Sequence, residues 1–151
     1  MCSNLLWKAN KRGETLLHMA ARHGHANVAD HLLQVCKIIK ADDQELGITA
    51  TRRMLQMTSH GAKDTALHEA VHYNNLDVVQ LLTKEDPSLP YDANKAGETP
   101  PYLAAERGYK RVLEEILITC YSPADHGPYD RSALHTSVLR NDIDKLIALS
   151  G

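Results

Sequence analysis

The sequence contains no phenylalanine and few aromatic residues of any kind. Phe, Trp and Tyr together make up 5% of the 151 residues, whereas 43% of the chain is hydrophobic. A core built from Leu, Val, Ile and Ala, with few rings, favours closely packed helices. The chain also lacks an excess of basic charge, because 17 basic residues face 19 acidic ones and the net charge is -2. This balance argues against nucleic acid as the main partner, since phosphate binding needs a concentrated basic face.

Cysteine pairs and long apolar runs are missing as well. The three cysteines, Cys2, Cys36 and Cys120, lie far apart and form no C-x-x-C pair. This spacing excludes a disulfide framework and a zinc knuckle and suits a reducing compartment. No apolar run approaches the roughly 18 residues that span a bilayer, and no signal peptide is visible. We therefore expect a cytoplasmic chain in which this segment does not insert into a membrane.

What the sequence does contain is an internal repeat. Four segments align, each beginning with Thr or Ser: 15–18, 65–68, 99–102 and 132–135. Their first residues are 50, 34 and 33 positions apart. Two of these intervals match a repeat unit of about 33 residues, and the first interval is that unit plus an insertion of about 17.

Each unit predicts a short helix with a defined start and end. The first residue is a good N-cap, whose hydroxyl accepts a hydrogen bond from an unpaired backbone N–H group. Gly or Asn follows nine positions later, and these residues best end a helix in the left-handed conformation. A second amphipathic helix of about ten residues follows, too short to be stable alone. The positions that define the units are Thr15, His18 and Gly24; Thr65, His68 and Asn74; Thr99 and Gly108; and Ser132, His135 and Asn141.

This pattern resembles the ankyrin repeat family, whose signature T-P-L-H-x-A-A-x-x-G-H is nearly matched by residues 15–25. The resemblance implies an all-α solenoid of helix-turn-helix units with hairpin-like turns, in which the capping Thr and the histidine tie each helix start to its turn. We expect one short helix in the insertion, over residues 48–57, set apart from what precedes it by Leu46 and Gly47. The expected units are 1–9 (the tail of a preceding repeat), 10–36 (repeat 1), 37–59 (the insertion), 60–93 (repeat 2), 94–126 (repeat 3) and 127–151 (a partial repeat 4).

Within the family, the insertion and the segments 64–71, 96–99 and 104–109 look like those of plant ankyrin–transmembrane proteins of the accelerated-cell-death type. That resemblance implies a role in plant defence or stress signalling, and a membrane-anchored parent protein whose membrane part is absent here. Neither end carries a clear polar capping repeat, which stacked arrays need for solubility. A truncated fragment without independent function is therefore an alternative.

One motif points to catalysis. Residues 68–72 read H-E-x-x-H, which on a helix places His68 and His72 on one face with Glu69 as a general base. A catalytic zinc also needs a third ligand, and Asn75 and Val78 stand where the longer form of the motif has Gly and His. Because His68 is also the repeat histidine, we expect a structural role and keep a zinc-dependent hydrolase as the alternative. We expect no enzyme activity, no cofactor and no metal.

The main candidate site is a protein-binding surface. Counted from each cap, offsets +4, +7 and +8 are expected to point away from the Ala-rich side of the first helix. Their Met, Tyr, Leu and Arg residues, mixed with both charges, suit protein recognition. We also expect Lys11, Arg12, Lys63 and Lys95 at the turn tips to steer a protein partner, whose identity the sequence does not give. These offsets form what we call the concave strip: Met19, Arg22, His23, Glu69, His72, Tyr73, Leu103, Glu106, Arg107, Thr136, Leu139 and Arg140.

Overall fold

The computed structural model describes residues 6–39, 44–87 and 92–119, and within these ranges every regular element is an α-helix. The helices are α1 (Leu16–His23), α2 (Ala26–Ile39), α3 (Gln44–Gln56), α4 (Ala66–His72), α5 (Leu76–Glu85), α6 (Pro100–Arg107) and α7 (Lys110–Thr119). The pairs α1–α2, α4–α5 and α6–α7 are three successive helix-turn-helix units. The predicted all-α solenoid is therefore confirmed. The partial fourth repeat that we expect over residues 127–151 lies outside the described residues.

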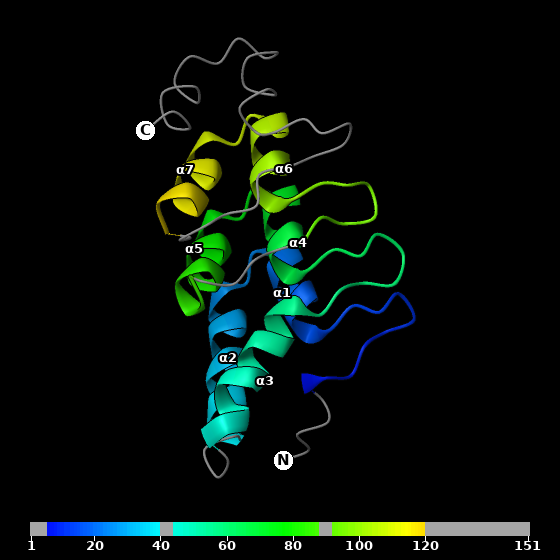
Figure 1. The fold of residues 1–151 in the computed structure, drawn as a ribbon, viewed down its shortest axis with the longest axis vertical. Coiled ribbons are helices and arrows are strands. Elements are labelled where there is room, and N and C mark those ends of the chain that lie inside the picture. The colour runs from blue at the N-terminus through cyan, green and yellow to red at the C-terminus, as the bar shows by residue number, and fades with distance from the viewer. Residues whose placement is uncertain (1–5, 40–43, 88–91, 120–151) are drawn as a thin grey trace.

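The units stack into two layers of helices. Helices α1, α4 and α6 pack side by side in one layer, and α2, α5 and α7 pack side by side in the other (Figure 1). We call these the inner and outer helices. The turn before each inner helix projects to the same side of the molecule, so successive turns lie next to one another. This arrangement produces a repeating surface along the inner helices and the turns.

The inner helices start and end largely as their sequences predict. Thr15 and Thr65 are extended N-caps whose hydroxyl oxygens accept the backbone N–H of the histidine three residues later. Left-handed backbone ends these helices, with φ of 72° at Gly24, 54° at Asn74 and 77° at Gly108. Ser132, His135 and Asn141, the equivalent positions of the fourth unit, lie outside the described residues.

The third unit departs from this capping pattern. Thr99 has the extended cap backbone, but its side chain makes no cap hydrogen bond to α6. Two prolines, Pro100 and Pro101, begin the helix, where a missing N–H is tolerated because first-turn N–H groups lack helical partners. Tyr102 replaces the repeat histidine and cannot accept the cap N–H through a ring nitrogen as His18 and His68 do.

Neighbouring turns are hydrogen-bonded to each other through their backbones. The N–H of His60 donates to the carbonyl of Arg12 at 2.8 Å, and the N–H of Lys95 donates to the carbonyl of Ala62 at 2.7 Å. The first turn needs Gly13, because its φ is 75° and an added Cβ would lie 2.8 Å from the backbone nitrogen of His60. The turns therefore form one continuous edge.

The insertion is more helical than the sequence predicts. Helix α2 continues to Ile39, and α3 begins at Gln44, so it includes Leu46 and Gly47, which we expected to separate the helix from the preceding residues. That expectation is wrong. A glycine inside a helix costs only about 1 kcal/mol relative to alanine, and packing outweighs that cost. Helix α3 packs against α2 and α4, and it buries Met54 and Leu55 with 1% of each exposed.

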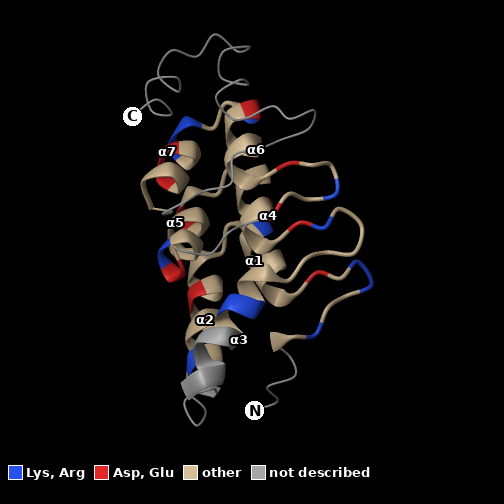
Figure 2. Ribbon diagram, in the orientation of Figure 1, with Lys and Arg blue, Asp and Glu red and all other residues tan. Residues whose placement is uncertain are grey.

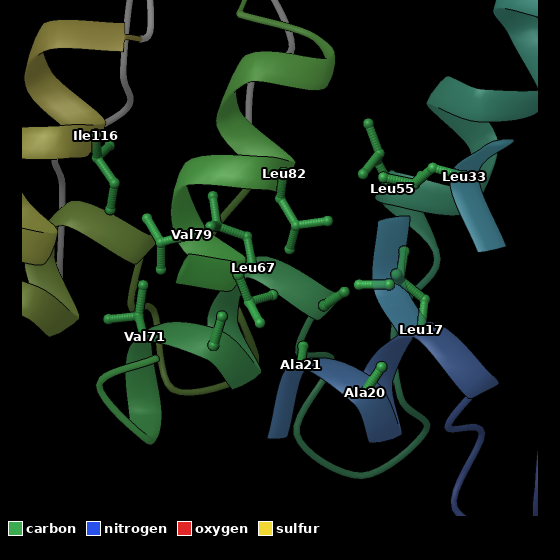
Figure 3. Close-up of a cluster of buried hydrophobic side chains, with 14 of the residues drawn as sticks. Leu17, Ala20, Ala21, Leu33, Leu55, Leu67, Val71, Val79, Leu82 and Ile116 are labelled. Carbon is green, nitrogen blue, oxygen red and sulfur yellow. The ribbon is translucent and has the colours of Figure 1, made fainter. Parts of the chain in front are cut away.

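The hydrophobic core runs through both layers and includes the insertion. Figure 3 shows Leu55 of α3 beside Leu33 of α2, within a cluster that extends to Leu67 of α4 and Ile116 of α7. Each fully buried side chain of this size stabilises the fold by about 1.5–3 kcal/mol. Cys36 is buried in the same core, as expected of a small apolar residue.

Candidate partner-binding surface

The repeat histidine connects each inner helix to the next turn. In the second unit, the backbone N–H of Thr65 donates to Nδ1 of His68 at 3.2 Å. The other ring nitrogen, Nε2, lies 3.0 Å from the carbonyl oxygen of Glu98 in the third turn. Because a carbonyl only accepts, Nε2 carries the hydrogen and Nδ1 is the acceptor. The imidazole is therefore neutral, and burial, the largest influence, lowers the pKa of His68.

His18 makes the same contacts between the first and second units. Its Nδ1 accepts from the N–H of Thr15 at 3.2 Å, and its Nε2 donates to the carbonyl oxygen of Asp64 at 2.9 Å. A second connection is made by Asn75, whose amide donates to the carbonyls of Ala21 and Arg22 at the end of α1. These contacts hold consecutive units in a fixed register, and they position the surface formed by the inner helices and the turns.

The zinc hypothesis finds no support in this geometry. Both ring nitrogens of His68 are engaged, so no lone pair faces a metal. Nε2 of His72 lies 3.4 Å from an oxygen of Asp64, and the described residues contain no group of three His, Cys, Asp or Glu side chains that could hold a metal ion. The H-E-x-x-H match in α4 combines a structural histidine, His68, with a half-buried histidine, His72, that contacts the side chain of Asp64.

The concave strip is only partly exposed. Tyr73 is 57% exposed, and His23 and Arg107 are exposed as well. Glu69 and Leu103 are buried, so the expectation that offset +4 faces a partner is wrong at these two positions. The half-buried members are Met19, Arg22, His72 and Glu106, and the members outside the described residues are Thr136, Leu139 and Arg140.

Arg22 explains the burial of Glu69. The Arg22 guanidinium donates to both carboxylate oxygens of Glu69 across the interface between α1 and α4, at 3.1 and 3.2 Å. It also donates to Glu14, at the base of the first turn, which accepts from Asn10 at 2.9 Å. The hydrogen bond from Asn10, with those from Arg22, lowers the pKa of Glu14 despite burial, and the two carboxylates raise the pKa of Arg22. One guanidinium therefore neutralises two largely buried acids.

Asp64 occupies in the second unit the position that Glu14 occupies in the first, one residue before the capping Thr. One of its oxygens accepts from Asn94 at 2.8 Å, and the other lies 3.4 Å from Nε2 of His72. Burial alone would raise the pKa of Asp64, but the hydrogen bonds from His72 and Asn94 outweigh burial and lower it. A hollow of about 400 Å³ opens at this point, lined by Ala62, Asp64, His72, Asn94, Lys95, Ala96 and Glu98.

Charges follow a regular order along each turn. Figure 2 shows an acidic residue where each turn returns to its inner helix, with basic residues at the tips of the first and third turns and a basic residue beside the acid in the second. The acidic residues are Glu14, Asp64 and Glu98, and the basic ones are Lys11, Arg12, Lys63 and Lys95. The acidic row and Asn94 were not predicted, although the sequence carries a signal for the row: an acid stands one position before each of Thr15, Thr65 and Thr99.

Comparison with known proteins agrees with the repeat geometry. The family described as ankyrin repeats (3 copies) matches this chain three times, over residues 1–90, 44–120 and 67–150. The chain belongs to the ankyrin-repeat family. Ankyrin repeats generally mediate protein–protein interaction and are typically non-catalytic. None of the described helices is long and apolar enough to cross a membrane.

Several ankyrin-containing proteins are similar to the chain over part of their length. It is 33% identical over 111 residues to the poly [ADP-ribose] polymerase tankyrase of Caenorhabditis elegans, which covers 71% of this chain and 5% of that protein. It is 32% identical over 108 residues to the leucine-rich repeat serine/threonine-protein kinase 1 of the same organism, a match that covers 72% of this chain and 4% of that protein. Mouse Rabankyrin-5 is 27% identical over 147 residues, a match that covers 88% of this chain and 13% of Rabankyrin-5. The chain thus spans a small fraction of each of these relatives.

Proposed function

We propose that this chain is a non-catalytic module that binds a partner protein on the concave surface formed by its inner helices and turns. The observation that carries the proposal is the continuous edge of hydrogen-bonded turns, which fixes the spacing of the inner helices that carry the exposed side chains of the strip. Tyr73 and Arg107 are the exposed anchors, since Tyr and Arg contribute most often to interface affinity. Lysines and Arg12 at the turn tips would speed association with an acidic partner.

The proposal is tested by selecting a displayed library of random peptides on the full chain. Peptides that bind the concave surface should lose at least tenfold in affinity for the double variant Tyr73→Ala/Arg107→Ala, measured by fluorescence anisotropy. The matched control is Lys84→Ala/Arg111→Ala, which changes exposed residues of the outer helices α5 and α7. Selected peptides that respond only to the control variant, or a selection that yields no binder, would overturn the proposal.

We further propose a cytoplasmic role in plant defence or stress signalling, within a membrane-anchored parent protein. The support is the resemblance of the insertion and of segments 64–71, 96–99 and 104–109 to the plant ankyrin–transmembrane proteins. This role predicts that the transcript encoding the chain rises in plant tissue treated with a bacterial elicitor. An unchanged transcript level would contradict the defence role and leave the binding proposal intact.

A further inference from the structure

The exposed charge on the three turns is basic, although the chain as a whole has a net charge of -2. The acids at the bases of the turns are withdrawn from the surface, since Glu14 and Asp64 are 7% and 5% exposed and Glu98 is half-buried. Within residues 8–14, 58–64 and 92–98, the exposed acid is Asp92. The exposed Lys and Arg residues of the same segments are Lys8, Lys11, Arg12, Lys63 and Lys95.

Three of these cations, one from each turn, follow the hydrogen-bonded edge. The backbone N–H of His60 donates to the carbonyl of Arg12, and that of Lys95 donates to the carbonyl of Ala62, the residue before Lys63. Across residues 6–39, 44–87 and 92–119, the ion pairs use other cations and none involves Arg12, Lys63 or Lys95. We call these three residues the cationic row. Their charges are free to meet an acid of another molecule.

Lys63 occupies a backbone position that suits glycine. The residue two positions before the capping Thr is Gly13 in the first turn and Gly97 in the third, with φ of 75° and 81°. Lys63 takes this position in the second turn, with φ of 57°. Left-handed backbone is unfavourable for a residue with a Cβ, whereas glycine adopts it without a steric penalty. Residues held in such backbone are concentrated at functional sites, so this lysine indicates a use for the charge that outweighs its cost to the turn.

The stack sets the spacing along the cationic row. The inner helices pack side by side, and packed helices lie about 8–10 Å apart. A polyproline II segment has three residues per turn and advances about 3.1 Å per residue, so every third side chain lies on one face, about 9 Å further along. Because this conformation exists before binding, the segment loses little entropy when it binds. Carboxylates at every third residue therefore match cations on successive turns.

Nucleic acid would also be attracted to a row of cations, but the turns lack what it needs. Proteins that bind single strands combine cations with aromatic side chains on which the bases stack. Residues 8–14, 58–64 and 92–98 contain no Phe, Trp or Tyr. A protein segment that carries carboxylates therefore fits the row better than a strand that carries phosphates and bases.

We propose that the cationic row binds an extended acidic segment of the protein partner, which lies across the three turns with a carboxylate at every third residue. The inference rests on the proposed function, that the chain binds a protein, and it names the charge and conformation of the part that lies on the turns. Arg12, Lys63 and Lys95 then determine specificity for this acidic segment. Tyr73 and Arg107 of the concave strip contact other parts of the same partner.

The probe is a fluorescein-labelled peptide of Glu-Pro-Pro repeats, whose binding is measured by fluorescence anisotropy at about 20 mM salt, where screening is weak. A peptide of Gln-Pro-Pro repeats should bind at least tenfold more weakly. A peptide of the same composition as the probe, with its glutamates in one block, should bind at least threefold more weakly because its carboxylates no longer match the spacing of the turns.

Matched variants place the binding on the row. Arg12→Gln/Lys95→Gln should weaken binding of the Glu-Pro-Pro peptide at least tenfold. The control Lys84→Gln/Arg111→Gln removes the same charge from exposed positions of α5 and α7, and it should change binding less than twofold. Far-ultraviolet circular dichroism checks that both double variants are folded. Equal losses for the two double variants would show that only net charge matters and would overturn the inference.

Lys63→Gly gives a test with two readouts. It should raise the thermal midpoint by about 2–4 °C, because glycine relieves the left-handed backbone, and it should weaken binding of the Glu-Pro-Pro peptide at least threefold. A lysine with no role in binding would change the thermal midpoint alone. An unchanged affinity for this variant would therefore overturn the assignment of Lys63 to the row.

The remaining outcomes separate this inference from the proposed function. Equal affinities for the Glu-Pro-Pro and Gln-Pro-Pro peptides, or tighter binding of an oligothymidylate than of the Glu-Pro-Pro peptide, would overturn the cationic row as a site for an acidic segment. The library selected on the full chain would still decide the proposed function, because Tyr73→Ala/Arg107→Ala leaves the row intact. A library without a concave-surface binder, together with row-dependent binding of the Glu-Pro-Pro peptide, would overturn the concave surface alone.

Discussion

The repeat histidine offers the sharpest test of how the units are held together. His68 is fully buried, and its two ring nitrogens join the N–H of Thr65 to the carbonyl of Glu98 in the next unit. The substitution His68→Ala leaves the buried N–H of Thr65 without its acceptor, which costs about 1–3 kcal/mol. Loss of the packed ring adds about 2 kcal/mol. We therefore expect the free energy of unfolding to fall by about 3–5 kcal/mol, a large part of the 5–15 kcal/mol typical of a domain.

The assay is urea unfolding followed by far-ultraviolet circular dichroism. Because His68 connects the second and third units, its loss should also reduce the slope of unfolding free energy against urea, as the third unit begins to unfold separately. The matched control is His31→Ala, an exposed histidine on α2, which should change stability by less than about 0.5 kcal/mol. A loss below about 1 kcal/mol for His68→Ala, with an unchanged slope, would refute the role given to the bridge.

Three further predictions concern pH, a turn and a charge cluster. Burial lowers the pKa of His68, so the unfolded chain binds this proton more tightly than the folded chain does, and the free energy of unfolding should fall as the pH drops below about 6.5 toward the lowered pKa. The urea midpoints at pH 7.5 and 5.5 should therefore differ less for His68→Gln than for the wild-type chain. An equal difference for both proteins would contradict this prediction. Gly13→Ala should lower the free energy of unfolding by at least about 1–2 kcal/mol in the same assay, because Gly13 has a positive φ and an added Cβ would approach the backbone of His60. The control Gly61→Ala, where an added Cβ meets open space, should leave the free energy of unfolding unchanged. Equal changes for the two variants would show that the first turn does not need glycine. Arg22→Leu should cost about 3 kcal/mol because two largely buried carboxylates lose their cation; a thermal midpoint equal to that of wild type would disprove it.

Much of the fold follows from the sequence because local and long-range signals coincide. Thr15 and Thr65 each act as an N-cap in their own helix, and the histidine three residues later serves both that cap and the next unit. Gly24, Asn74 and Gly108 end the inner helices with left-handed backbone, as a nine-residue offset predicts. These signals are strong because the same residue types recur at the same offsets in each unit.

The binding surface was less predictable because it depends on contacts between units. Offset +4 was counted on a single helix, where it faces outward, but in the stack it lies against the preceding inner helix. Glu69 is consequently buried by Arg22, and Leu103 is fully buried. The predicted start of helix α3 lies too far along the chain, because the sequence shows the helix penalty of Gly47 but not the burial of Met54 that compensates for it.

The insertion separates the first and second units along the chain but not in space. Helix α1 packs directly on α4, and the backbone N–H of His60 donates to the carbonyl of Arg12 in the first turn. The first and second units are therefore direct neighbours in the stack. Helix α3 instead lies against α2 and is tied to the end of α5 by an ion pair, 2.9 Å long, between Arg52 and Asp86. Substitutions in α3 can therefore alter the stability of the array while the hydrogen-bonded turns keep the spacing of the inner helices constant.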